Sequence, residues 1–361
     1  FNPVDFDPDK WLDIAEETGM EYICFTAKHI DGFCMWDTKQ TDYNVMNSPY
    51  GKDILGMLAD ACHRRSFPLC IYYSAVDNHH PNYPNQGRPY ELQRPEEGDE
   101  PDLNKYMNFL REQVRELCTQ YGEMHGFWWD AGDILGIRDD SINKMIRTLQ
   151  PKAVINNRGF SDGDFDTPER DWYSFVEEDA WFAKPTEACQ SIGMESWGYR
   201  VEEDYYADRY IMQSIDKIMA KGGNYLLNVG PMANGEFSSE ALAILKNIGK
   251  WYKTVKESFE NAIPASHVID NTEYLLTKEE GGFRTDKVVI RDVLLTVKEN
   301  SIYVHLYKPP VGNRVMLRPI DILPKKAILL NTGEELEVST DLVPSLYEEN
   351  RGYLRIRNIP V

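Results

Sequence analysis

The sequence predicts an α/β protein: a (β/α)8-like, TIM-type barrel followed by a C-terminal antiparallel β-sandwich. Short apolar runs alternate with amphipathic stretches over residues 1–257, a pattern typical of a parallel sheet covered by helices. In a closed β/α barrel the carboxyl ends of all strands open onto one mouth, where the active site lies. Polar residues that could take part in catalysis or binding follow five of the runs, at 22–25, 69–71, 127–129, 153–155 and 225–227. The pattern therefore predicts one pocket holding a carboxylate, an imidazole and a guanidinium, and hence an enzyme.

Length and charge limit the alternatives. The 361 residues suffice for one barrel and a smaller domain. The net charge of −20 counts against a nucleic-acid partner, since such binding needs clustered Lys and Arg. No apolar run reaches about 18 residues, so we expect no membrane span, and no signal peptide is visible. The chain begins with Phe1 rather than Met, which is consistent with removal of a preceding segment.

The cysteines do not form a pattern. They are scattered and contain no CxxC pair, so we expect no disulfide framework. The six positions are Cys24, Cys34, Cys62, Cys70, Cys118 and Cys189.

Caps and periodicity place the elements of the barrel region. Asp7 and Pro8 suit the start of a helix over 7–18, and Gly19 suits its end. Further helices are expected over 53–65, 103–121, 141–149, 206–221 and 238–255. Strands are expected over 20–28, 68–74, 125–129, 154–156 and 225–229. Two segments lack periodicity and are predicted irregular: the polar loop 77–102 and the aromatic, acidic stretch 159–200.

Near residue 257 the hydrophobic pattern changes from helical periodicity to the alternation of short strands. Strands over 288–297 and 302–307 flank Glu299 and Asn300, a plausible hairpin turn. The alternation continues at 327–331 and 354–356. We therefore predict a catalytic barrel over 1–257 and a β-sandwich over 258–361.

Asp130 and Arg158 are the strongest candidates for chemistry. Asp130 ends the run GFWWD and would act as nucleophile or base, although an Asp capping the next turn fits equally well. Arg158 ends the next strand, where its guanidinium would clamp a carboxylate or sugar hydroxyls; a structural salt bridge is the alternative. Glu169 lies in the loop beyond and competes with other loop carboxylates, namely Glu177, Glu178, Glu187 and Glu195.

Histidines offer a second interpretation. His29 follows Lys28 at a strand end, and His79 and His80 are adjacent in the long loop. Their spacing lacks the HxH or HExxH pattern of metal ligands, so we expect no metal site. A metal-dependent barrel hydrolase using these three histidines is kept as an alternative.

Aromatic residues point to carbohydrate. Tryptophans gather near predicted strand ends, where ring faces can stack on sugars while hydroxyls meet polar groups, although core packing explains some of them. They are Trp36, Trp128, Trp129, Trp172, Trp181 and Trp197. Together with the carboxylates they favour glycoside hydrolysis, in which one carboxylate attacks the anomeric carbon and another protonates the leaving oxygen.

Several motifs, in order, resemble the α-L-fucosidases of glycoside hydrolase family 29. The segment FTAKHIDGFCMWD at 25–37, followed by TDYNV at 41–45, is similar to the family's KHHDGF…WD…TDYNV region. Further matching motifs are YYS at 72–74, GFWWDAG at 126–132, NNR at 156–158, GDFDTPE at 163–169, SWGY at 196–199 and LNVGP at 227–231. The resemblance covers most of residues 1–257.

The resemblance implies a retaining, exo-acting hydrolase that releases terminal α-L-fucose from a fucosylated oligosaccharide or glycoconjugate without a cofactor. It assigns the nucleophile to Asp130 and the general acid/base to Glu169. The remaining positions would bind fucose: His29 and Arg158 its hydroxyls and the neighbouring carboxylate, Tyr72 the pocket wall, and Trp197 the C5 methyl group. A non-catalytic glycan-binding relative is the alternative. The resemblance also favours a periplasmic or secreted location.

Two departures accompany the resemblance. The second histidine of the family's pair is Ile30 here, which removes a polar contact to a sugar hydroxyl. The family's first barrel strand and its early histidine have no counterpart, because the matching region begins just past them at Phe1.

Overall fold

The computed structural model describes residues 1–93, 95–170, 181–265, 273–279, 282–290, 293–310, 312–317, 323–342 and 352–360. These residues form two compact units, each of which combines separate stretches of chain. The first unit contains Phe1–Pro168, Ser191–Asp204 and Leu226–Lys246, and the second contains Glu169–Gln190, Tyr205–Tyr225 and Asn247–Val361. The predicted boundary at residue 257 stays a prediction.

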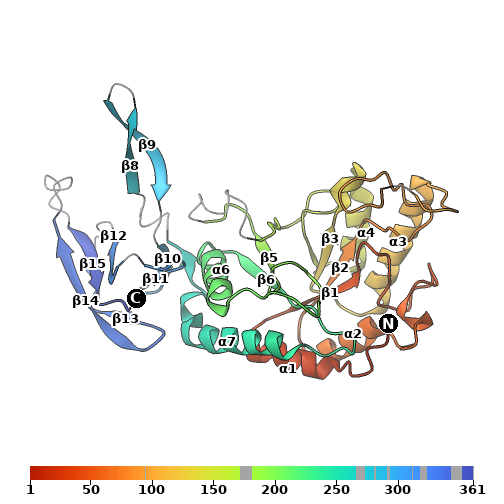
Figure 1. Cartoon of the computed structure of the whole chain (residues 1–361), viewed down its shortest axis with the longest axis horizontal. Coiled ribbons are helices and arrows are strands. Elements are labelled where there is room, and N and C mark those ends of the chain that lie inside the picture. Colours follow the sequence, from red (N-terminus) through yellow and green to blue (C-terminus); the bar gives the residue numbers. More distant parts are fainter. Residues whose placement is uncertain are drawn as a thin grey trace. The chain divides into compact units, whose positions relative to one another are not determined.

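The first unit is built on a parallel sheet with the strand order β1-β2-β3-β4 (Figure 1). Its strands are β1 (Ile23–Lys28), β2 (Leu69–Ser74), β3 (Gly126–Asp130) and β4 (Val154–Ile155). The helices that connect consecutive strands are α2 (Ile54–Arg65), α3 (Leu103–Gln120) and α4 (Asp140–Leu149), and α1 (Pro8–Thr18) precedes β1. Each predicted strand and helix of this part is confirmed, with ends shifted by one to three residues.

Local caps explain where the helices begin. Asp7 accepts a hydrogen bond from the Asp9 amide at 3.0 Å, and Gly19 ends α1 with a φ of 88°. Asp53 and Asp102 cap α2 and α3 in the same way. These carboxylates satisfy amide groups that the first helical turn leaves without partners.

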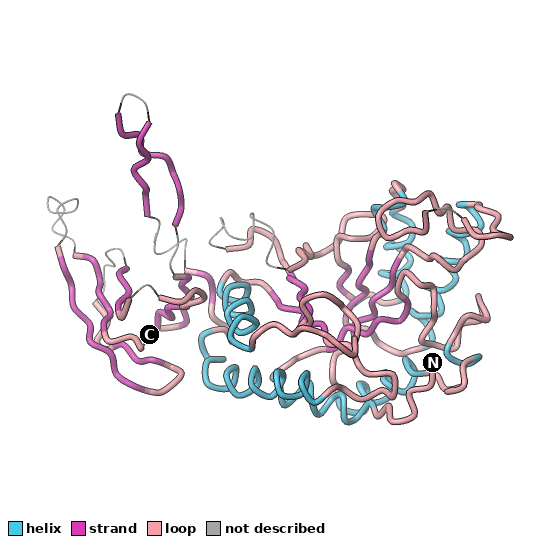
Figure 2. The backbone as a smooth tube through the Cα atoms, viewed as in Figure 1, coloured by secondary structure: helices cyan, strands magenta, loops and turns pink. Residues whose placement is uncertain are grey.

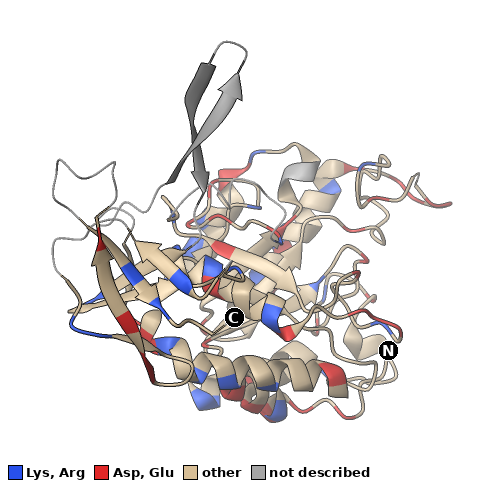
Figure 3. Cartoon of the chain, turned by 60° about the vertical axis from the view of Figure 1, so that its left-hand side comes forward, with Lys and Arg blue, Asp and Glu red and all other residues tan. Residues whose placement is uncertain are grey.

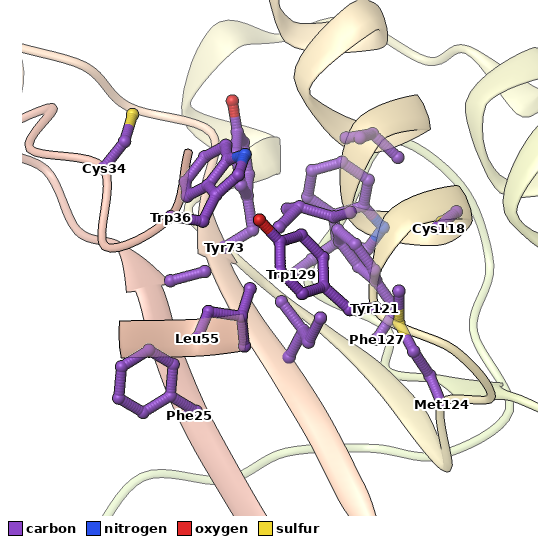
Figure 4. Packing of buried hydrophobic residues seen from close by; sticks show 14 of the residues in the cluster. Phe25, Cys34, Trp36, Leu55, Tyr73, Cys118, Tyr121, Met124, Phe127 and Trp129 are labelled. Carbon is purple, nitrogen blue, oxygen red and sulfur yellow. The ribbon is translucent and has the colours of Figure 1, made fainter. Parts of the chain in front are cut away.

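Large aromatic side chains fill the core between this sheet and its helices. Trp36, Tyr73, Phe127 and Trp129 are almost completely buried and lie close together beside Leu55 of α2 (Figure 4). Tyr73 donates a hydrogen bond to Gln113 at 2.6 Å, and Trp129 donates one to Asn143 at 3.0 Å. The buried polar atoms of these two rings therefore form hydrogen bonds, which offset the cost of removing them from water.

The chain continues with four further elements. They are β5 (Glu187–Ser191), α6 (Asp208–Ala220), β6 (Asn224–Asn228) and α7 (Ser239–Val255), and β5 pairs with β6. The expectation of irregular structure throughout 159–200 was wrong, because β5 forms within it. All five residues of β5 are buried although Glu187, Gln190 and Ser191 are polar, so the strand carries no apolar pattern. Closure of the described strands into an eight-stranded barrel stays a prediction.

The carboxyl-terminal residues form antiparallel sheets (Figure 2). One sheet has the order β11-β10-β7, a second β12-β15-β14-β13, and a third pairs β8 with β9. The strands are β7 (Ile263–Pro264), β8 (Glu273–Glu279), β9 (Gly282–Ile290), β10 (Leu294–Lys298), β11 (Ser301–His305), β12 (Arg314–Leu317), β13 (Ala327–Leu329), β14 (Glu334–Asp341) and β15 (Tyr353–Arg357). Short 3₁₀ helices lie at Val45–Asn47, Gly132–Leu135 and Lys256–Ser258.

The predicted hairpin at Glu299 and Asn300 is confirmed, since Lys298 pairs with Ser301 across it. The single strand expected over 288–297 was wrong. Residues 288–290 belong to β9 and residues 294–297 to β10, and these two strands lie in different sheets. Apolar residues lie on both sides of Arg291 and Asp292, so the pattern could not show that the pairing partner changes.

One apolar cluster joins the two larger carboxyl-terminal sheets. Leu295 of β10 belongs to the same buried group as Val315 of β12 and Ile356 of β15. Such shared burial is the packing that a β-sandwich requires.

Acidic and basic residues are interspersed along helices, strands and loops (Figure 3). All six cysteines lie in the described part of the chain, and none of them forms a disulfide there. Among the described helices, none combines the length and apolarity needed to cross a bilayer.

Candidate active site

Asp130 lies at the carboxyl end of β3, held by side chains from the strands on either side. The Tyr72 hydroxyl on β2 donates a hydrogen bond to Oδ2 of Asp130. Arg158, just beyond β4, donates through Nη2 to Oδ1 at 2.5 Å. The carboxylate is partly buried, with 18% of its side chain exposed, so it stays open to a ligand. These contacts bring together three residues that the sequence singled out, Asp130, Tyr72 and Arg158.

The backbone turns sharply after Asp130. Ala131 has a φ of 56°, a left-handed conformation that is uncommon outside glycine. The next residue, Gly132, donates its amide to the Arg158 carbonyl at 3.0 Å, and a Cβ there would lie only 2.8 Å from Gly159. Glycine is needed at this position because the two loops touch through their backbones. This contact places the chain that carries Arg158 beside Asp130.

The environment of Tyr72 keeps its hydroxyl protonated. Burial raises the pKa of Tyr72 well above its ordinary value, and the neighbouring Asp130 carboxylate raises it further. The phenol therefore acts as a hydrogen-bond donor to Asp130 across the neutral range. A donor on each carboxylate oxygen fixes the orientation of the Asp130 carboxylate.

Four side chains form a continuous stack across the ends of the strands. His29 stacks on Tyr72 with ring centroids 5.6 Å apart, and Tyr72 stacks on Trp128 at 5.3 Å. The Arg158 guanidinium lies over the Trp128 ring at 5.2 Å. Tyr72 and Trp128 share a face because they are register partners in β2 and β3. The stack limits how these side chains can rotate, so the contacts with Asp130 are held in place.

A buried asparagine fixes the two strands that carry Asp130 and Arg158. Asn156 accepts a hydrogen bond from the Trp129 amide at 2.8 Å and donates one to the Trp129 carbonyl at 2.9 Å. The side chain thereby extends the pairing of β3 and β4 beyond their short ladder. The sequence pattern indicated Arg158 but not this supporting role of its neighbour.

A buried ion pair lies next to His29 and was not predicted from the sequence. Lys28 Nζ lies 2.8 Å from Asp77 Oδ2, and both side chains are almost completely buried. Burial by itself lowers the pKa of Lys28, but Asp77, Tyr106 and Cys34 together outweigh burial and raise it. Burial would raise the pKa of Asp77, but Lys28 and backbone hydrogen bonding lower it. A lysine within an apolar strand was the available signal, since buried lysines require partners.

Glu169 belongs to the second compact unit. It is half-buried and forms an isolated bridge with Cys189 of β5, and the next residue, Arg170, donates its amide to the Cys189 carbonyl at 2.8 Å. This bridge anchors the loop that follows β4. The predicted approach of Glu169 to Asp130 stays a prediction.

The rival carboxylates have different surroundings. Glu187 is buried within β5, whereas Glu195 is exposed and paired with Arg200. Glu177, Glu178 and Trp172 lie outside the described residues.

Trp197 lies in a half-buried turn of the first unit. Ser191 donates a hydrogen bond to the Ser196 carbonyl at 2.9 Å, and Gly198 donates its amide to the Ser196 hydroxyl at 3.1 Å. Gly230 approaches this turn so closely that a Cβ would lie 2.3 Å from the Tyr199 amide nitrogen. The SWGY and LNVGP motifs thus meet through their backbones, while contact of Trp197 with fucose stays a prediction.

The three histidines of the metal-dependent alternative have separate partners. His79 stacks on Tyr43 at 3.8 Å, and the His80 ring packs against Phe109 at 4.1 Å. His29 stacks instead on Tyr72. Within the described residues, no three His, Cys, Asp or Glu side chains gather as metal ligands would.

The long loop after β2 is organised by a buried carboxylate. Glu91 accepts hydrogen bonds from the Tyr83 hydroxyl at 2.6 Å and from the Arg88 guanidinium. Burial would raise the pKa of Glu91, but the hydrogen bonds from Arg88 and Tyr83 lower it. This network gives the loop a defined shape although its sequence has no periodicity.

Comparisons with known proteins agree with this geometry. A sequence model of the α-L-fucosidase family matches residues 1–257. Alpha-L-fucosidase 1 of Arabidopsis thaliana is 28% identical over 297 residues, which cover 71% of this chain and 53% of the relative. Tissue α-L-fucosidase of Bos taurus is 23% identical over 350 residues, covering 92% of this chain and 68% of the relative. The chain thus spans about half the length of the first of these relatives.

Solved structures show the same likeness. α-L-Fucosidase isoenzyme 1 from Paenibacillus thiaminolyticus superposes with a TM-score of 0.76 at 30% identity, covering 100% of this chain and 84% of that one. A family 29 α-L-fucosidase from Bacteroides thetaiotaomicron, solved as a trapped covalent intermediate, gives 0.72 at 25% identity, covering 99% and 83%. The match over residues 1–257 establishes that this chain belongs to the α-L-fucosidase family, glycoside hydrolase family 29.

Proposed function

We propose that the protein is a retaining exo-α-L-fucosidase that releases terminal α-L-fucose from fucosylated glycans. The observation that carries the proposal is the Asp130 carboxylate, which accepts hydrogen bonds from Tyr72 and Arg158 at the carboxyl end of the parallel sheet. Family membership adds the substrate class, and the barrel mouth is the proposed place of binding.

Asp130 is the proposed nucleophile of the first step. One carboxylate oxygen attacks the anomeric carbon, the bond to the leaving oxygen breaks, and that oxygen takes a proton from Glu169. Arg158 and Tyr72 orient the carboxylate for attack, and their hydrogen bonds to it weaken as the ester forms because the carboxylate loses its charge.

Water completes the cycle in the second step. Glu169, now ionised, removes a proton from water, the water oxygen bonds to the anomeric carbon, and the ester bond to Asp130 breaks. Both partners return to their starting states. The product keeps the α configuration because two inversions occur at one carbon.

Aromatic and polar groups supply the sugar contacts in this proposal. His29 is exposed beside Tyr72 and can donate to a fucose hydroxyl, and Trp197 would cover the C5 methyl group. An apolar wall at that methyl distinguishes fucose from sugars with a hydroxymethyl group.

Turnover of an aryl α-L-fucoside, followed by proton NMR of the first-released sugar, tests the proposal. We expect hydrolysis with α-L-fucose as the initial product and no turnover of the aryl β-L-fucoside. Initial release of β-L-fucose would contradict the double-displacement mechanism.

Two alternatives predict different results. A glycan-binding relative would bind fucose in calorimetry without turning over either fucoside. A metal-dependent hydrolase would lose activity on chelation, whereas the proposed mechanism leaves the rate unchanged. We further propose export to the periplasm or outside the cell, which fractionation of the native source would test.

A further inference from the structure

A register shift at the end of β1 decides which way Lys28 and His29 face. Thr26 pairs with Tyr72, but Lys28, two residues on, pairs with Tyr73 rather than with Ser74. The extra residue is a bulge at Ala27, whose carbonyl accepts the Met35 amide at 2.9 Å. Because side chains alternate along a strand, the bulge turns Lys28 to the face of Tyr73 and leaves His29 to stack on Tyr72.

Lys28 occupies an aromatic and acidic environment on the buried face. Its ammonium group lies 4.5 Å from the centre of the Tyr73 ring and 5.6 Å from that of Phe109 in α3. The Asp77 carboxylate, 2.8 Å away, is its anionic partner. A buried ammonium at this position is stable only while that carboxylate is present.

Asp77 in turn holds the start of the loop that follows β2. Its second oxygen accepts the amides of His79 at 3.1 Å and His80 at 2.9 Å. The Asn78 amide donates to the Ile30 carbonyl at 2.8 Å, one residue past His29. Asp77 thus binds Lys28, the residue before His29, and the Asn78 amide binds Ile30, the residue after it. These two contacts hold the start of the loop after β2 against the chain on both sides of His29.

We propose that Lys28 and Asp77 are positioning residues for the fucosidase reaction, which hold His29 on Tyr72 and thereby in line with Asp130. The inference rests on the proposed function, since it assigns His29 a role in that reaction. Both side chains are almost completely buried, so neither touches substrate in this scheme. Replacing them affects turnover only by displacing His29.

A double-mutant cycle separates positioning from general support. The paired substitution Lys28→Met with Asp77→Asn removes both charges together, so no unpaired charge stays buried. With His29 present, we expect kcat/KM on the aryl fucoside to fall roughly 10- to 100-fold, as for a small misplacement of a reacting group. In a His29→Ala background, the same pair should cost less than about 2-fold.

Glu116→Gln is the matched control. Glu116 is a buried carboxylate of α3 that holds the loop after β1 by accepting hydrogen bonds from Thr38 at 2.7 Å and Gln40 at 2.9 Å. We expect it to lower the Tm while its effect on kcat/KM stays equal with and without His29. Equal losses from the paired substitution in both backgrounds would overturn the positioning role.

A measurement that does not depend on turnover distinguishes failure of the positioning role from failure of the proposed function. We expect the NMR shifts of the His29 imidazole to move in the paired variant, because stacking on Tyr72 is lost, while the Glu116→Gln protein keeps them. Unchanged His29 shifts in the paired variant would overturn the inference even if the wild type hydrolyses fucosides. A wild-type protein without activity whose His29 shifts respond as expected would instead count against the proposed function alone.

Discussion

The Tyr72 hydroxyl donates a hydrogen bond to Oδ2 of Asp130, so strand β2 supplies one of the two donors that hold this carboxylate. Arg158 supplies the other from beyond β4. Donors from both neighbouring strands orient the carboxylate without requiring it to be fully buried. Orientation together with access is what a nucleophile needs.

Replacing Asp130 tests the nucleophile directly. We expect Asp130→Ala and Asp130→Gly to lower turnover of an aryl α-L-fucoside by at least roughly 10⁴-fold, about 5.4 kcal/mol of barrier, because the ester can no longer form. Circular dichroism should show an intact fold. Added azide should enter the space left by Asp130→Gly and form a β-fucosyl azide, detected by NMR. Near-wild-type hydrolysis by either variant would remove Asp130 from the mechanism.

Replacing Glu169 tests the acid/base role. We expect Glu169→Ala to reduce hydrolysis of natural glycans far more than that of aryl fucosides with acidic phenols, since good leaving groups need little protonation. A series of aryl fucosides with graded leaving groups measures this dependence. An equal loss across the series would show that Glu169 does not protonate the leaving oxygen, and Glu195→Ala would then be the next variant to measure.

Tyr72→Phe removes one donor to Asp130 and keeps the aromatic stack. We expect kcat to fall roughly 10- to 100-fold, in line with about 1.5–3 kcal/mol for a hydrogen bond to a charged group. Tyr73→Phe is the matched control, because the adjacent Tyr73 faces the core and donates to Gln113 at 2.6 Å. That control should lower stability by about 1 kcal/mol with unchanged kinetics. Similar kinetic losses for both variants would contradict a specific role of the Tyr72 hydroxyl.

Buried tyrosines predict a loss of stability at alkaline pH. Burial raises the pKa of Tyr72, Tyr73 and Tyr106 well above the ordinary value. Below a pH of about 10 both folded and unfolded chains keep these protons; above it only the unfolded chain releases them, so the free energy of unfolding falls as pH rises. We expect tyrosinate absorbance from these groups to appear together with loss of tryptophan fluorescence. Complete ionisation of all tyrosines in a still folded protein would contradict this prediction.

Much of the first unit could be predicted from local sequence. Asp7 and Gly19 mark the ends of α1 because caps act over a few residues, and the apolar runs mark β1, β2 and β3 because burial on both faces requires them. The same reasoning failed for β5, whose buried residues include Glu187 and Gln190. Partners distant in sequence decide whether such polar residues can be buried.

Asp130, Arg158, Tyr72 and His29 were visible in the sequence as polar residues at strand ends, and motifs that resemble a known family assigned their expected roles. The sequence by itself thus determined the order of the elements and which groups reach one end of the sheet. Only the tertiary structure decided that Tyr72 and Arg158 take different oxygens of one carboxylate. It alone also revealed that a bulge at Ala27 sends Lys28 to Asp77 and His29 to Tyr72. Strand register and pairing set these contacts, and both depend on residues dozens of positions apart, which local pattern cannot specify.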